Sequence, residues 1–129
     1  MTDAEYEAAK ARFDALAARW VPLLGLTDWH ITWDYRRQDA NDFRTDNPDE
    51  IAKAHVIWTY LSAIVTIWLP GFEDLSDARR EFIFVHELMH LVLNEMREDQ
   101  GQDTIQHEER VATVLAQAFL RTHAAGATV

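Results

Sequence analysis

Residues 85–93 read VHELMHLVL, an apolar run that carries His86, Glu87 and His90. A helix advances about 100° per residue, so the two histidines would lie on one face, one turn apart, with Glu87 beside them. Two neutral imidazoles at this spacing suit a tetrahedral zinc ion. In the H-E-x-x-H pattern the glutamate does not bind the metal but acts on a water molecule. Burying these three polar side chains without partners would be energetically costly. An ordinary apolar helix does not explain what would offset that cost. The stretch therefore predicts one zinc ion per chain, with Glu87 as a general base.

A catalytic zinc site normally has three protein ligands and an open position, so the chain must supply another donor. The next helical segment, HEERVATVLAQAFL from residue 107, carries two adjacent glutamates near its start. Glu109 is in phase with small residues that would permit close approach to the first helix. Glu108 is in phase with larger apolar residues of the same segment. Periodicity leaves both glutamates open as the third ligand.

HELMH followed by a helix of the form E-x-x-A-x-x-x-A resembles the gluzincin class of zinc metallopeptidases, and the small size resembles its minimal, single-domain and phage-type members. The resemblance covers roughly residues 51–121, and its specific part is the two helices. In that class the ligand glutamate precedes a small residue at the third position and a polar one at the fourth, which Glu109, Ala112 and Thr113 match. Members more often carry Asn or Asp at the Thr113 position. Metzincins would continue the motif with glycine and histidine, where this chain has Leu93 and Met96.

The resemblance implies a small, soluble zinc-dependent metallopeptidase that acts on protein or peptide substrates. Its ligands would be His86, His90 and Glu109. Zinc held there would lower the pKa of its bound water to about 7, and Glu87 would take the proton as the water attacks a peptide carbonyl. The alternative is a zinc-binding regulatory or interaction module of peptidase descent with little or no proteolysis, which needs the same metal. The intact Glu87 favours the enzyme.

The resemblance also bears on the substrate. In folds of this class an edge strand lies above the zinc and pairs antiparallel with an extended peptide, and the resemblance suggests Ala63–Leu69 for that strand. One further donor usually stabilises the oxyanion. The available side chains are Tyr60, His107 and His123, and the sequence does not choose among them.

The chain length fits one domain over residues 1–129, since 129 residues can bury one hydrophobic core. A hydrophobic fraction of 48% with five tryptophans predicts a well-filled interior, and a formal charge of −10 argues against a nucleic-acid partner. The chain has no cysteine, which excludes disulfides and thiolate metal sites. It also has no signal-peptide pattern and no apolar run long enough to span a bilayer, so we expect a cytoplasmic protein without a membrane partner.

The expected fold class is α+β and zincin-like. The first helix follows an apolar stripe over residues 6–20, capped by Thr2 or Asp3, and residues 26–35 alternate as a half-buried strand. Residues 36–50 read as a long polar loop. Residues 51–60 and 63–69 predict an antiparallel hairpin, which completes a small three-stranded sheet. The active-site helix should run from Ser76 or Asp77 to about residue 96, and the glutamate helix from about residue 104 to 122, before a frayed tail.

Overall fold

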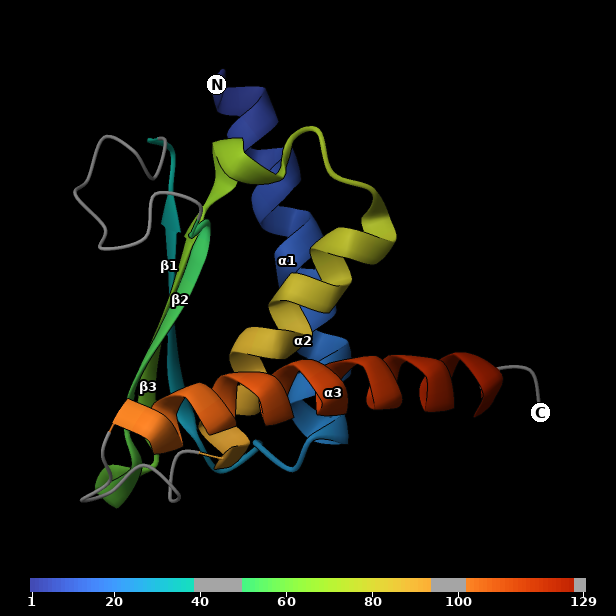
Figure 1. Cartoon of the computed structure of the whole chain (residues 1–129). Helices are drawn as coiled ribbons and strands as arrows, with labels where there is room; N and C mark the ends of the chain where they lie inside the picture. Colours follow the sequence, from blue (N-terminus) through green and yellow to red (C-terminus); the bar gives the residue numbers. More distant parts are fainter. Residues whose placement is uncertain (39–49, 94–101, 127–129) are drawn as a thin grey trace.

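The computed structural model describes residues 1–38, 50–93 and 102–126, and for Trp58, residues 102–107 and residues 124–126 it describes the backbone only. Three helices and a three-stranded sheet make up these ranges, so the predicted α+β class is confirmed (Figure 1). In chain order the elements are α1 (Asp3–Leu23), β1 (His30–Arg36), β2 (Ala52–Ile57), the 3-10 turn η2 (Trp58–Tyr60), β3 (Ser62–Trp68), the 3-10 turn η3 (Leu69–Phe72), α2 (Asp77–Leu93) and α3 (Gln102–Gly126).

Helix α1 begins and ends with local signals in the sequence. The hydroxyl of Thr2 accepts a hydrogen bond from the backbone N–H of Glu5, which satisfies one of the helix's free donors. At the other end Gly25 has a φ of +72° and donates its N–H to the carbonyl of Pro22. Glycine adopts this left-handed conformation at little cost, so the chain reverses there. The reversal moves the start of the following strand from the predicted residue 26 to His30.

Strand β3 lies at the centre of the sheet, whose order is β1-β3-β2. β2 and β3 form the predicted antiparallel hairpin, and β1 pairs parallel with β3. The prediction that Ala63–Leu69 forms an edge strand is therefore wrong, because β3 is hydrogen-bonded on both sides. The edge strand that packs against α2 is β2.

Alternate residues of the sheet pack against α1 and α2, which lie alongside one another (Figure 1). The ring of Trp33 on β1 stacks on Phe84 of α2, with centroids 5.4 Å apart. Phe13 of α1 packs edge-on against Phe72, at 4.9 Å, and also contacts Phe84. These aromatic contacts join α1, the sheet and η3 to α2, so they fix the helix that carries the H-E-x-x-H motif.

Helix α2 begins at the Ser76 cap, whose hydroxyl accepts from the N–H of Arg79, and residues 94–96 of its predicted end lie outside the described residues. Helix α3 packs against α2 through Ala112 and Ala116, which are both fully buried. α3 continues to Gly126, beyond the predicted end at residue 122. The ring of His123 lies 5.2 Å from that of Trp20, so the start of the predicted frayed tail packs on α1. Residues 127–129 of that tail lie outside the described residues.

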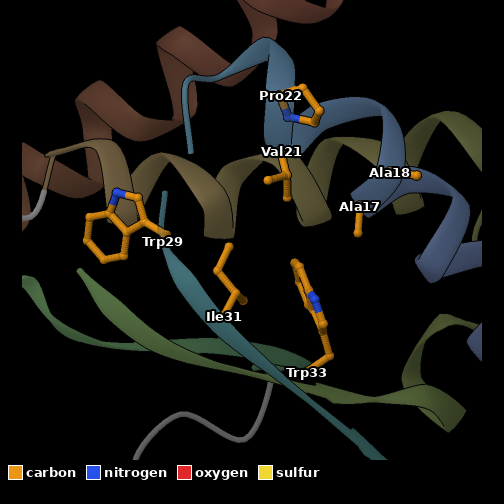
Figure 2. A pocket seen from close by; sticks show the side chains of 7 residues that line it. All are labelled: Ala17, Ala18, Val21, Pro22, Trp29, Ile31 and Trp33. Atoms are coloured by element: carbon orange, nitrogen blue, oxygen red, sulfur yellow. The ribbon is translucent and has the colours of Figure 1, made fainter. Parts of the chain in front are cut away.

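An apolar groove of about 340 Å³ lies between α1 and β1 (Figure 2). Its residues are Ala17, Ala18, Val21, Pro22, Trp29, Ile31 and Trp33. None of them is titratable, so the groove offers no group for acid, base or metal chemistry. Within the described ranges, no helix is long and apolar enough to cross a membrane.

Candidate metal centre

The three residues of the H-E-x-x-H motif lie on α2 where α3 packs against it. The rings of His86 and His90 are 4.9 Å apart and nearly perpendicular. The side chains of His86, Glu87 and His90 are 17%, 12% and 8% exposed. The i, i+4 spacing therefore brings both imidazoles together in a mostly buried position, as the sequence predicted.

Glu109 of α3 faces both histidines. Its Oε1 lies 2.9 Å from Nε2 of His90, and its Oε2 lies 3.4 Å from Nε2 of His86. One ligand atom from each of these three residues lies within 4.8 Å of the others. Ligand atoms about 2.0 to 2.1 Å from a tetrahedral zinc ion are about 3.3 Å apart, which is close to these separations. The side chain of Glu109 is 52% exposed, so the cluster is open to solvent on one side.

The environment of the Nε2 atom of His86 shows whether the cluster suits a metal ion. This nitrogen is buried and has no hydrogen-bond partner, because the 3.4 Å approach of Glu109 is an ion-pair distance without hydrogen-bond geometry. Buried polar atoms normally have a partner, and a metal ion would provide one. Two imidazoles and one carboxylate are also the ligand types of known catalytic zinc sites. The residues present therefore fit zinc.

Glu108 lies behind His90 and does not face the cluster. Its carboxylate is completely buried, and Oε1 lies 2.8 Å from Nδ1 of His90. An ionised carboxylate only accepts hydrogen bonds, so Nδ1 of His90 carries the proton and donates it. In the neutral imidazole, Nε2 then presents its free electron pair toward Glu109, the arrangement that metal-binding histidines show.

Periodicity left the two glutamates open, the resemblance implied Glu109, and the structure groups Glu109 with the two histidines. Glu109 joins the donor cluster and Glu108 holds His90. The second role was missed, although a signal for it exists: Glu108 is in phase with the large apolar residues of α3, and a carboxylate on a buried face needs a partner.

The carboxylates change the proton affinity of the histidines. Burial lowers the pKa of His86, but Glu109 and Glu87 raise it by more, to about 9. Burial also lowers the pKa of His90, which Glu109 and Glu108 raise above its ordinary value. His86 and His90 in turn hold the pKa of Glu109 well below its usual range. Without a metal, protons would hold this cluster together, so zinc must displace them.

Glu87 is next to the cluster without belonging to it. Its Oε1 lies 3.7 Å from Nδ1 of His86, on the opposite side of the ring from Nε2. The hydroxyl of Thr113, at the position where the resembled class more often carries Asn or Asp, donates to the backbone carbonyl of Glu109 in its own helix, at 3.0 Å. Neither residue adds a fourth donor atom to the cluster of His86, His90 and Glu109.

The three candidate oxyanion donors fare differently. His123 is 14 residues beyond Glu109 on α3, which is about 21 Å along a helix axis, so it lies outside the site. Tyr60 is 80% exposed on η2, and the structure describes no hydrogen bond from it. The side chain of His107 lies outside the described part of the structure.

Comparison with known families supports a metallopeptidase-like protein. Residues 66–124 match the family Peptidase_M78, described as the IrrE N-terminal-like domain. The matched range runs from the end of β3 through α2 and most of α3, so it contains every donor of the cluster. Comparison with curated proteins and with solved structures found no significant match.

Proposed function

We propose that this chain is a zinc-dependent peptidase of the gluzincin type. His86, His90 and Glu109 would hold one zinc ion, and Glu87 would act as the general base. The observation that carries the proposal is the convergence of two Nε2 atoms from α2 and a carboxylate from α3 on one point, open to solvent on one side. The family match over residues 66–124 supports it.

The chemistry divides between the metal and the chain. Zinc, when bound, acts as a Lewis acid that activates water and polarises a carbonyl. Glu87 takes a proton from the attacking water as the carbon–oxygen bond forms, and passes it to the amine nitrogen as the carbon–nitrogen bond breaks. Glu108 keeps His90 in the tautomer that presents Nε2. The exposed side of Glu109 leaves room for a substrate carbonyl to approach.

The substrate is proposed to be an extended segment of a protein or peptide. Edge strands bind such segments through backbone hydrogen bonds that are largely indifferent to sequence. Because β3 is the central strand, the edge available beside α2 is β2. The peptide would therefore pair with Ala52–Ile57 instead of the strand first predicted.

The decisive experiment compares the wild type with Glu87→Gln, with the exposed Glu73→Gln as a control that removes the same charge elsewhere. We expect all three proteins to bind one zinc ion per chain, because Glu87 is outside the donor cluster. Only the wild type and the control should cleave an unfolded protein or a peptide library. Equal cleavage by Glu87→Gln would exclude Glu87 as the base. A zinc-loaded wild type that cleaves nothing would instead favour the zinc-binding regulatory module.

A further inference from the structure

A second cavity lies on the face of the sheet that is turned away from α1 and α2. It has a volume of about 360 Å³, at the small end of the range for ligand sites. Alternate residues of all three strands line it, and the strand register places them side by side. They are Asp34, Arg36, Lys53, His55, Ile64, Thr66 and Trp68. None of them belongs to the metal centre.

Trp68 is the unusual member of this set. It is only 5% exposed, and its indole Nε1 is buried without a hydrogen-bond partner. Buried polar atoms rarely lack a partner, and each exception calls for an explanation. An indole N–H can only donate, so the missing group is an acceptor such as a carboxylate or phosphate oxygen.

The charges around the cavity favour a negatively charged acceptor. Asp34 is already neutralised by Arg36, whose Nε donates to Oδ2 at 2.9 Å and whose Nη2 forms an ion pair with Oδ2 at 2.8 Å. The Thr66 hydroxyl also donates to Oδ2, at 3.3 Å. Lys53 is exposed beside this pair and, among the described residues, forms no ion pair. Among the residues that the structure describes, one positive charge at the cavity therefore has no ion-pair partner, in a chain whose formal charge is −10.

We propose that this cavity binds a small oxyanion, a carboxylate or a phosphate ester, attached to an apolar group. One anionic oxygen accepts the hydrogen bond of Trp68 Nε1, and Lys53 supplies the opposite charge. The apolar part packs on Ile64, a residue that is 44% exposed on the same face. The site lies across the sheet from α2, and it does not depend on the proposed peptidase activity.

The test follows the indole N–H signal of Trp68 by NMR in the ¹⁵N-labelled, zinc-loaded full chain. The probes are benzoate and phenyl phosphate, with benzyl alcohol as the uncharged analogue, and Trp68→Phe assigns the signal. We expect either anion to shift this signal saturably, and the alcohol to leave it unchanged. The better of the two anions identifies the source of the oxyanion as carboxylate or phosphate.

Lys53→Gln should weaken binding of the anion about tenfold, because it removes a charge-assisted contact. The matched control is Lys10→Gln on α1, the only other lysine of the chain, which should bind as the wild type does. Absence of any shift with both anions would overturn the proposal, as would equal affinity for benzyl alcohol or unchanged affinity in Lys53→Gln. The lysine variants keep the test valid if Trp68→Phe fails to fold.

Discussion

Replacing Glu108 by glutamine isolates the role of the buried carboxylate behind His90. The substitution keeps the size of the side chain and an oxygen that can accept the hydrogen bond, but it removes the negative charge. Zinc binding by His90 should weaken, because the neutral amide is a poorer acceptor for Nδ1–H and makes Nε2 less basic. The zinc ligands themselves remain in place.

The size of the effect follows from the contact. The hydrogen bond is 2.8 Å long, and its two side chains are 8% and 0% exposed, so water screens it little. A hydrogen bond to a charged group contributes about 1.5 to 3 kcal/mol. Glu108→Gln keeps the hydrogen bond but removes its charge, and changing such a partner of a metal-binding histidine typically weakens metal affinity about 10-fold to 100-fold.

The assay is a zinc competition titration against a chelator, run on the wild type, Glu108→Gln, Glu109→Gln and the charge-matched control Glu73→Gln. Glu109→Gln should lose more affinity than Glu108→Gln, since it alters a ligand, and Glu73→Gln should lose none. ¹⁵N NMR of the His90 ring in the zinc-loaded protein reports whether Nδ1 still carries the proton. Wild-type affinity in Glu108→Gln would refute the positioning role. A greater loss in Glu108→Gln than in Glu109→Gln would show that the two roles are exchanged.

Three further outcomes follow from the same geometry. Although burial lowers the pKa of His86, Glu109 and Glu87 raise it to about 9, so zinc affinity measured by titration calorimetry should rise with pH up to that value. At pH 7 proton competition at His86 alone should weaken binding about 100-fold relative to the deprotonated site. In the metal-free protein the raised pKa of His86 gives stability that is complete below its unfolded value of 6.5 and is lost as the pH rises through about 9. Urea unfolding should therefore show a lower free energy of unfolding at pH 9.5 than at pH 6, and the opposite order would contradict the assignment. Phe13→Ala should lower that free energy by about 3 to 5 kcal/mol, because Phe13 is 2% exposed among three aromatic rings. A loss below about 1 kcal/mol would mean that this cluster does not hold α1 to α2.

The sequence predicts the elements well where a local pattern determines them. The 3.6-residue stripe of α1, the cap at Ser76 and the hairpin of β2 and β3 all depend on neighbouring residues, and all three are found. The spacing of His86 and His90 is of the same kind, since any helix through them brings the two rings together.

What the sequence could not predict depends on contacts between distant segments. Periodicity identified a strand at Ala63–Leu69 but did not show that β1 would pair with it, and this pairing turns a proposed edge into the centre of the sheet. The choice between Glu108 and Glu109 has the same origin. Both belong to one helix, and the face that α3 turns toward α2 decides which carboxylate reaches the Nε2 atoms.

The adjacency of the two glutamates itself has a physical consequence. Neighbours on a helix point about 100° apart, so one backbone position of α3 places Glu108 in the interface with α2 and Glu109 at its rim. The close packing of Ala112 and Ala116 on α2 sets that position for both carboxylates at once. Enlarging Ala112 should therefore weaken zinc binding and the His90 hydrogen bond together, whereas changing either glutamate separates the two effects. Because zinc would bind only the folded arrangement, loss of this packing should also reduce the stabilisation that zinc gives.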